Sequence, residues 1–561
     1  MDTKNKMKGI LIKVFLLKEI LSLRSSIDLR HENEGQNVYL DYSNNDTIGS
    51  LVSLINNLNI SVNNNTFESI KTTGTGGSLR YVAPFTSYHL KDNSFINSSS
   101  TSHGGSVYLT GIHDLNINNC SFIDSQCSNY GGAAYISSTN ALIENVYCEN
   151  ILASSHAGTL YLTGTTHFLT NVSIINSRSG QNGGAIFCSV NTFKFYNSRI
   201  QLSQITVASK IGGAIYSSSG TLFDVNGCLF IHIYCSGHGG AIHLNAGGTM
   251  PIYIKETTFY NCSSFNGNGG AVYVVSSSSS YHLSIEIDKI CATQCSITSS
   301  TSSFGHVLFI DSSAAANSIS TLSYISMHSC GEITQGISNL YVYESQPKLL
   351  NTNGSYCQAF RSSIFYFLPT FTVSCHYNTY FNNSSPNFDC IFIQGPATVY
   401  SASIQNSNFI RNYCPASIIN VTAYGSRLTI QECIFINNTG FVLMKSNIAN
   451  ILVKNCYIYH LTTVGVNATF ESTKTTKVNT QTYQLSHYST VFCSTPDDMG
   501  QLELPCQTIP IPPTAIPNCQ DCITLPPTQT ECFIESAGNI SLLSQIIGII
   551  RSSLLLFNFI E

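Results

Sequence analysis

Short runs of alternating hydrophobic and polar residues follow a pair of small residues, and this arrangement recurs along the first half of the chain. Copies include "HGGSVYLTG" (103–111), "YGGAAYISS" (130–138), "QNGGAIFCSV" (181–190) and "NGGAVYVVS" (268–276). After each pair, apolar residues occupy the second and fourth positions, as Val107 and Leu109 do after Gly105. Alternation with period two predicts a strand that buries one face.

The second residue of each pair marks a repeat of about 27 residues. The markers are Gly77, Gly105, Gly132, Gly158, Gly184, Gly213, Gly240 and Gly270. Their intervals are 28, 27, 26, 26, 29, 27 and 30 residues, a spread that allows loop insertions but no change of unit. Since glycine in a strand costs entropy and packs no side chain, each pair predicts a corner with positive φ or no room for a Cβ.

A second landmark, a phenylalanine, lies roughly ten residues before a glycine pair. It occurs at Phe67, Phe95, Phe122, Phe230 and Phe259, and returns without glycines at Phe409 and Phe435. A unit of two or three short strands cannot bury its apolar face alone, whereas a stack of such units can. We therefore predict an all-β fold, a right-handed parallel β-helix with coils of about 27 residues. The leucine spacing of the rival leucine-rich solenoid is absent.

Four segments follow from the pattern. Residues 1–40 have a basic leader and an apolar stretch interrupted by Lys13 and Lys18, and form a weak candidate signal sequence. Residues 41–485 form the predicted β-helix, and residues 486–535 a stalk rich in cysteine and proline. Residues 536–561 are an apolar tail that contains Arg551, a candidate membrane anchor.

Composition favours a location outside the cytosol. The chain has 21 cysteines, which suits an oxidising compartment. It also has many Asn-x-Ser/Thr acceptors, among them Asn59, Asn97, Asn119, Asn171, Asn261, Asn353, Asn420, Asn437, Asn467 and Asn539. In an exported chain the stalk cysteines are candidates for disulfides: Cys493, Cys506, Cys519, Cys522 and Cys532. A net charge of -5 without a basic cluster makes nucleic acid an unsuitable partner.

With these two landmarks alternating, the chain resembles the polymorphic outer membrane protein repeat family, whose signatures are Gly-Gly-Ala-Ile and Phe-x-x-Asn. Matching stretches are 183–186, 212–215, 239–242 and 269–272 for the first signature, and Phe409 to Asn412 and Phe435 to Asn438 for the second. The resemblance covers residues 60–310 well and 350–460 faintly. It implies a surface-exposed β-helical protein, in several members an adhesin, and such repeats also occur in surface proteins of parasitic protists.

One departure from the bacterial members concerns export. Those members end in a membrane β-barrel of several hundred residues, whereas about 75 residues follow residue 485 here, without strand alternation. We therefore expect a eukaryotic surface or secreted form, with glycosylation sites and a stalk.

The candidate binding residues are aromatic side chains at the third position after each marker. They are Tyr108, Tyr135, Tyr161, Phe187, Tyr216, His243 and Tyr273. If the alternating neighbours point inward, these side chains point outward and form a stripe along one face. The stripe either stabilises the sheet by mutual stacking, or is covered by another segment, or docks a glycan, a protein or a neighbouring rod.

The sequence offers weaker signals for chemistry. "GHGG" (237–240) is similar to the Gly-His-Gly of polygalacturonases, but His238 shares its repeat position with His103 and His156, and the only Asp-Asp pair, at 497–498, lies in the stalk. These histidines stand two and three coils apart, roughly 10 and 14 Å, too far to share a metal ion. Cys120, Cys228 and Cys433 precede the landmark phenylalanines by two residues and predict a buried column of thiols.

The resulting hypothesis is a binding or adhesion rod without catalysis or cofactor, exposed on the cell surface or secreted. Its expected partner is a protein or glycan on the surface of a host or neighbouring cell. The alternatives are a carbohydrate-active enzyme of the pectin lyase-like class and a purely structural component of a surface coat.

Overall fold

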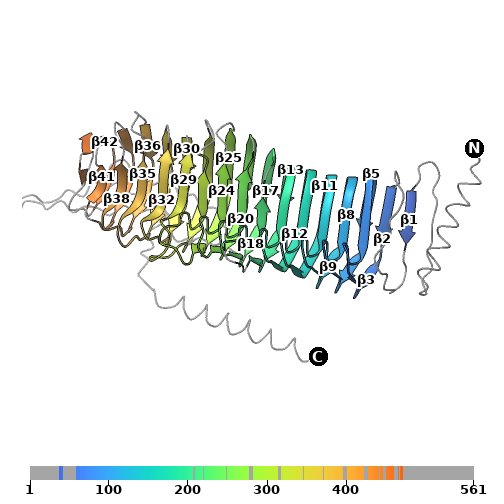
Figure 1. The fold of residues 1–561 in the computed structure, drawn as a ribbon. Helices are drawn as coiled ribbons and strands as arrows, with labels where there is room; N and C mark the ends of the chain where they lie inside the picture. The colour runs from blue at the N-terminus through green and yellow to red at the C-terminus, as the bar shows by residue number, and fades with distance from the viewer. Residues whose placement is uncertain are drawn as a thin grey trace, which may run out of the picture. The chain divides into compact units, whose positions relative to one another are not determined.

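The computed structural model describes residues 37–41, 59–205, 207, 209–218, 220–247, 249–276, 282–313, 318–344, 346–369, 372–395, 401–422, 427–440, 442–446, 450–459, 465–466 and 468–471. Within these ranges all regular elements are β-strands, and they stack in parallel as a β-helix (Figure 1). The prediction of an all-β, right-handed parallel β-helix with coils of about 27 residues is confirmed.

Each coil contributes to three sheets and one short ladder. The first sheet follows the glycine corner and contains β5 (Leu79–Lys91), β8 (Val107–Asn118), β11 (Ala134–Ala153), β12 (Leu160–Ser179), β13 (Ile186–Tyr196), β16 (Ile215–Ser217), β20 (Ile242–Ala246), β24 (Val272–Ser276), β27 (Leu308–Asp311), β29 (Ser338–Glu344), β32 (Ser362–Pro369), β35 (Asp389–Gln394), β38 (Ser417–Thr422), β41 (Val442–Ser446) and β44 (Gly465–Val466).

The second sheet continues from the first, and in the longest strands without a break. It contains the later parts of β5, β8, β11, β12 and β13 together with β1 (Asn37–Asp41), β2 (Asn59–Asn63), β17 (Leu222–Asn226), β21 (Met250–Lys255), β25 (Leu283–Thr293), β28 (Ile319–His328), β30 (Gln346–Leu350), β33 (Val373–His376), β36 (Ser401–Gln405), β39 (Arg427–Gln431), β42 (Asn450–Lys454) and β45 (Ala468–Glu471).

The third sheet carries the landmark phenylalanines. It contains further parts of β11, β12, β25 and β28 together with β3 (Thr66–Glu68), β6 (Ser94–Ile96), β9 (Ser121–Ile123), β14 (Arg199–Gln201), β18 (Leu229–Ile231), β22 (Thr258–Tyr260), β31 (Asn353–Ser355), β34 (Thr379–Phe381), β37 (Asn408–Ile410), β40 (Ile434–Ile436) and β43 (Tyr457–Tyr459). The short ladder contains the ends of β11 and β12 with β4 (Lys71–Thr72), β7 (Ser99–Ser100), β10 (Gln126–Cys127), β15 (Gln204–Ile205), β19 (Tyr234–Cys235), β23 (Ser263–Ser264) and β26 (Ser296–Ile297).

The lengths of the coils equal the intervals between the marker glycines. Along the first sheet from Leu79 to Val272, register partners are separated by 28, 27, 26, 26, 29, 27 and 30 residues. The stack continues where the glycine pairs fade, because Val272 pairs with Leu308 and Leu308 with Leu340. Those two coils have 36 and 32 residues, so their extra length obscures the repeat in the sequence.

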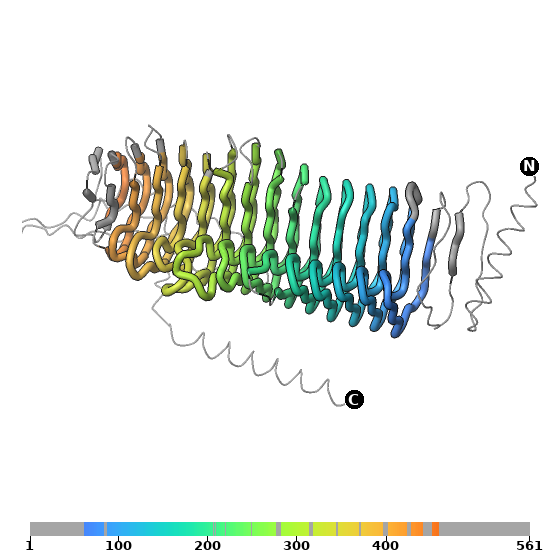
Figure 2. The backbone as a smooth tube through the Cα atoms, viewed as in Figure 1, coloured from blue at the N-terminus to red at the C-terminus, as the bar shows by residue number. Residues whose placement is uncertain are grey.

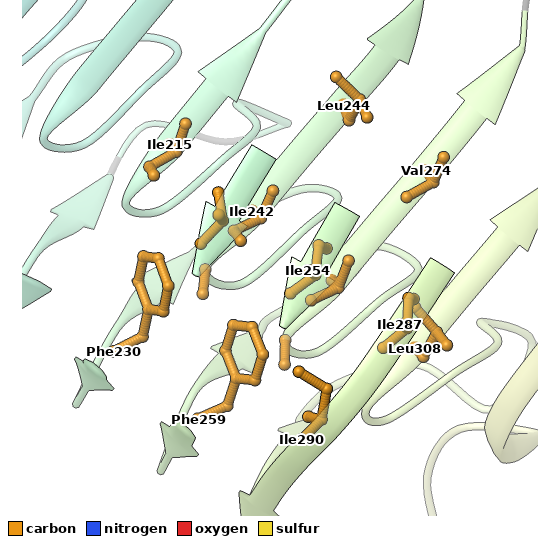
Figure 3. Close-up of a cluster of buried hydrophobic side chains, with 14 of the residues drawn as sticks. Ile215, Phe230, Ile242, Leu244, Ile254, Phe259, Val274, Ile287, Ile290 and Leu308 are labelled. Carbon is orange, nitrogen blue, oxygen red and sulfur yellow. The ribbon is translucent and has the colours of Figure 1, made fainter. Parts of the chain in front are cut away.

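The core consists of like side chains stacked along the axis. The landmark phenylalanines lie in one interior column of the third sheet, with ring centroids of Phe95 and Phe122 4.8 Å apart and of Phe230 and Phe259 5.2 Å apart. Figure 3 shows Phe230 and Phe259 facing the interior together with Ile242 from the first sheet and Ile254 from the second. Burial of these columns against one another is what the isolated coil lacks.

The two glycines of a pair have different roles at the corner, where the backbone turns from the short ladder into the first sheet (Figure 2). Gly131 has φ of +72°, a conformation that costs little only for glycine. Gly132 has no such φ, but a Cβ built on it would collide with the carbonyl oxygen of Gly158 in the next coil. Both expected reasons therefore apply, one to each member of the pair.

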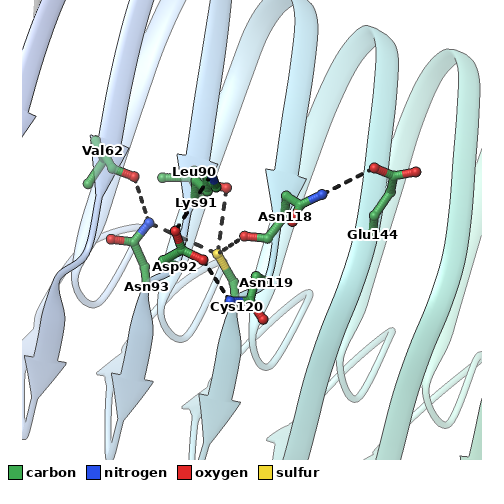
Figure 4. A network of polar contacts seen from close by, with 9 residues as sticks. All are labelled: Val62, Leu90, Lys91, Asp92, Asn93, Asn118, Asn119, Cys120 and Glu144. Carbon is green, nitrogen blue, oxygen red and sulfur yellow. Dashed lines mark hydrogen bonds and ion pairs between the residues drawn. The ribbon is translucent and has the colours of Figure 1, made fainter.

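Polar residues also form columns, inside and outside. Figure 4 shows the buried Asn93 and Cys120: the Asn93 amide donates to the carbonyl of Val62 (2.6 Å), and the Cys120 thiol lies 3.6 Å from the carbonyl oxygen of Leu90. Burial raises the pKa of the Cys120 thiol to about 11, so it stays protonated and acts as a small core residue. Cys228 and Cys433 are likewise buried free thiols, as predicted.

Candidate functional site

The structure brings the seven predicted stripe residues into one column on the outer face of the first sheet. Successive members are direct register partners, from Tyr108 with Tyr135 to His243 with Tyr273. We call this column the aromatic ladder. Except for His243, which is buried, the seven side chains are half-buried.

The rings of the ladder lie face to face. Centroids are 5.0 Å apart for Tyr108 and Tyr135, 4.9 Å for Tyr135 and Tyr161, and 4.7 Å for Tyr161 and Phe187, with planes tilted by 23°, 9° and 8°. Offset stacking of this kind stabilises each aromatic pair by about 0.5–1.5 kcal/mol beyond burial. Because neighbouring rings cover each other's faces, the ladder presents ring edges and hydroxyl groups to solvent.

The ladder extends further than the sequence indicated. Tyr273 stacks on Phe309 at 4.8 Å, and the column continues through Tyr341, Tyr366 and Phe392. These four were missed because the glycine markers fade there, although Gly305 still has φ of +76° and Phe309 follows it at the usual distance. The four added rings are buried, and Phe304 and Ile337 pack against them.

Cations lie near both ends of the ladder. The Arg80 guanidinium is 6.0 Å from the centroid of the Tyr108 ring at the N-terminal end. Near the C-terminal end, Arg361 lies 5.5 Å from Tyr366 and 5.2 Å from Phe392. These cation–π contacts and the burial of Phe309 to Phe392 leave the N-terminal coils, from Tyr108 to Tyr216, as the accessible part of the ladder.

A second column, at the glycine corner, packs beside the ladder. His103 lies 5.3 Å from Tyr135, Tyr130 lies 5.0 Å from Tyr161, and His238 lies 4.7 Å from Tyr273, all between ring centroids. The backbone N–H of Asn268 donates to Nδ1 of His238 (2.9 Å), which requires that nitrogen to be unprotonated. His238 of the "GHGG" stretch is thus a structural member of this corner column.

The accessible strip is uncharged near neutral pH. Burial lowers the pKa of His103, His156 and His238. Burial, with His238 nearby, lowers the pKa of His243 to about 3, and burial raises the pKa of Tyr161 to about 12. Within the described ranges, no group of three His, Cys, Asp or Glu side chains is arranged to hold a metal ion.

A row of hydroxyl groups runs parallel to the ladder on the same face. Thr110, Ser137, Thr163 and Ser189 are register partners, each two residues after a ladder ring and each half-buried. The strip therefore consists of three neighbouring rows: corner side chains, aromatic rings and aliphatic hydroxyls.

The five stalk cysteines and the Asp497–Asp498 pair lie outside the described residues. The structure instead contains a disulfide that the sequence did not single out, between Cys390 and Cys414, whose Cα atoms are 5.8 Å apart. The two residues come from successive coils, so the bond links neighbours along the axis.

The fold and the ladder together define a parallel β-solenoid with an aromatic face. Comparisons with family models, with curated proteins and with solved structures find no match to this chain. The described residues include no helix long and apolar enough to cross a membrane, and the apolar tail at 536–561 lies beyond them.

Proposed function

We propose that this chain is a binding protein of the cell surface or the extracellular space, and that the aromatic ladder from Tyr108 to Tyr216 is its contact strip. The observation that carries the proposal is the half-exposed, continuous ladder with a hydroxyl row beside it. The resemblance to the polymorphic outer membrane protein repeat family supports the same assignment.

The chemistry of the strip favours an uncharged glycan as the partner. Ring edges, phenolic hydroxyls and the side chains of Thr110, Ser137, Thr163 and Ser189 offer apolar contact and neutral hydrogen bonds, and no acidic or basic side chain lies in these rows. Coils repeat at about 4.8 Å, so a polymer extended along the axis meets the same groups at each step. Ring faces are occupied, so we expect edge contacts and hydroxyl contacts rather than stacking of sugars on the rings.

A structural coat component is the second candidate function. The observation in its favour is the stacking itself, since each ladder ring already has aromatic partners on both sides. In that case the ladder stabilises the β-helix and the chain binds copies of itself.

The test is a substitution that removes hydroxyls and keeps the stack. Serine at Tyr135 and Tyr161 would remove several ring pairs at once, so it would lower stability as well as binding. We therefore choose Tyr108→Phe, Tyr135→Phe and Tyr161→Phe together, with Tyr377→Phe and Tyr413→Phe as the control, because both control rings are exposed away from the ladder (51 % each).

Purified wild type and both variants are applied to an array of neutral and acidic oligosaccharides, and self-association is followed by sedimentation. We expect the ladder variant to lose at least about tenfold in affinity for neutral glycans at an unchanged melting temperature, as two or three lost hydrogen bonds would produce. Glycan binding that is absent in the wild type, or equal in all three proteins, contradicts the proposal. Self-association without glycan binding supports the coat component instead.

A further inference from the structure

The outer face of the third sheet changes from exposed to buried along the axis. In β3, β6 and β9 its first outward position is Thr66, Ser94 and Ser121, which are exposed or half-buried. From β22 onward the same position is at most 5 % exposed in every coil. The members of this buried column are Thr258, Cys291, Ser326, Asn353, Thr379, Asn408, Ile434 and Tyr457.

These side chains cannot be buried by the core. Each is followed by a residue of the interior column, such as Phe409 after Asn408, and successive residues of a strand point to opposite faces. In the described ranges, strands of the third sheet pair only with the coils before and after them. Their outer face is therefore covered by chain from outside those ranges.

The composition of this face changes in the same direction. The second outward position is Glu68 in β3 but Ile410 in β37 and Ile436 in β40, and both isoleucines are buried. Apolar side chains on an outer sheet face gain stability when another segment packs on them.

Cys291 identifies the covering segment. It lies in the buried column and is disulfide-bonded, whereas all other cysteines of the described residues are free thiols or belong to the Cys390–Cys414 pair. Its partner is therefore one of the five cysteines after residue 486. Of these, only Cys493 belongs to the compact unit Met1–Pro505 that contains the β-helix.

We propose that residues 481–493 lie along the outer face of the third sheet and that Cys493 is bonded to Cys291. The segment reads "QTYQLSHYSTVFC", has no proline, and places Tyr483, Leu485, Val491 and Cys493 on one side of an extended strand. Apolar residues and the reacting thiol would thus face the sheet together.

The chain is long enough for this path. Six coil steps separate Tyr457 from Cys291, about 29 Å at 4.8 Å per step. An extended chain needs about nine residues for that distance, and 22 residues connect Glu471 to Cys493. The remainder allows a turn back along the stack.

The bond requires an oxidant. Both thiols lose their protons, the Sγ–Sγ bond forms, and two electrons with two protons pass to a disulfide such as oxidised glutathione, which becomes two thiols. The Cys291–Cys493 bond then closes a loop of about 200 residues, for which loop-closure entropy predicts a stabilisation at the upper end of the usual range.

The experiment maps disulfides in the full-length chain produced through a secretory pathway. Non-reduced protein is digested with pepsin, and tandem mass spectrometry assigns the partner of Cys291. We expect a Cys291–Cys493 peptide that disappears on reduction, and slow hydrogen exchange in residues 481–493. A free Cys291, a bond from Cys291 to any other cysteine, or fast exchange in residues 481–493 overturns the proposal.

Two variants complete the design. Cys493→Ser should make Cys291 available to an alkylating reagent and lower the melting temperature by several degrees. Cys519→Ser is the matched control and should change neither property. Equal alkylation of Cys291 in both variants contradicts the assignment. Glycan binding plays no part in these readouts, so they are independent of the proposed function.

Discussion

At the scale of single residues, the corner of each coil shows why the sequence repeats glycine twice. Gly131 needs the left-handed conformation, and Gly132 needs the space that a Cβ would take from the next coil. The chain itself contains one exception, Ala157, which occupies the first position of a pair with φ of 58°. A methyl group is thus tolerated at the first position, at a conformational cost, and no coil from Gly77 to Gly270 has one at the second.

This difference predicts unequal effects of alanine at the two positions. Gly131→Ala should lower the free energy of unfolding by about 1–2 kcal/mol, the cost of a left-handed residue. Gly132→Ala should cost about 3 kcal/mol or more, because backbone atoms of two coils must separate. Gly74→Ala is the control, since no atom lies within 4 Å of its added Cβ. Urea denaturation of the three variants measures the order, and equal effects at Gly131 and Gly132 would refute this explanation.

At the scale of elements, columns of like residues decide what each position tolerates. Asn412 of the Phe-x-x-Asn signature donates to the carbonyl of Tyr380 and to Oδ1 of Asn438 (2.9 Å each), and accepts from the backbone N–H of Asn383 (3.0 Å). In earlier coils the same column holds thiols, and the Cys295 thiol lies 3.5 Å from the Phe259 carbonyl oxygen. The signature therefore marks a buried position where the side chain must bond to the backbone.

The aromatic ladder predicts a dependence of stability on pH. Burial lowers the pKa of His243 to about 3 from an ordinary value of 6.5, so the unfolded chain binds this proton more tightly than the folded chain. Its contribution to stability is complete above pH 6.5 and is lost as the pH falls toward 3. The slope from this group is at most about 1.4 kcal/mol per pH unit.

His243→Tyr restores the residue type found at most ladder positions and should flatten the fall in melting temperature between pH 6.5 and 4. His167 and His306, whose pKa values burial also lowers, retain their own contributions. The exposed His232, changed to asparagine, is the control. Circular dichroism melts at several pH values measure the slopes, and a His243→Tyr slope equal to that of the wild type would contradict the argument.

At the scale of the whole molecule, the coils divide the glycosylation acceptors into two groups. Asn97, Asn119, Asn171, Asn261 and Asn437 are exposed corner residues with φ near 50°. Asn353 and Asn420 are buried, and the Asn420 amide donates to the Asp389 carboxylate (2.8 Å). A glycan fits at a corner, whereas at Asn420 it would have to enter the packed stack.

For an exported chain this predicts glycans at the five corner residues and none at Asn353 or Asn420. Tagged full-length protein on intact cells is treated with a surface protease or with a peptide N-glycosidase, and occupancy is read from glycopeptide masses. Accessible protein with the corner pattern supports the extracellular assignment. A protected, unglycosylated and fully reduced protein would contradict both that assignment and the proposed disulfide of Cys291.

The sequence by itself determined the repeat, the fold class, the length of each coil up to Val272 and the seven aligned rings, because all of these depend on residues a fixed distance apart within one coil. Only the tertiary structure decided what lies across coils. It placed the long coils before Leu308 and Leu340 in register, extended the ladder to Phe392, joined Cys390 to Cys414, and buried the outer face from Thr258 to Tyr457. These features depend on contacts between segments with no periodic relation, such as Arg361 over Tyr366 and Phe304 against Tyr341, and no local pattern encodes them.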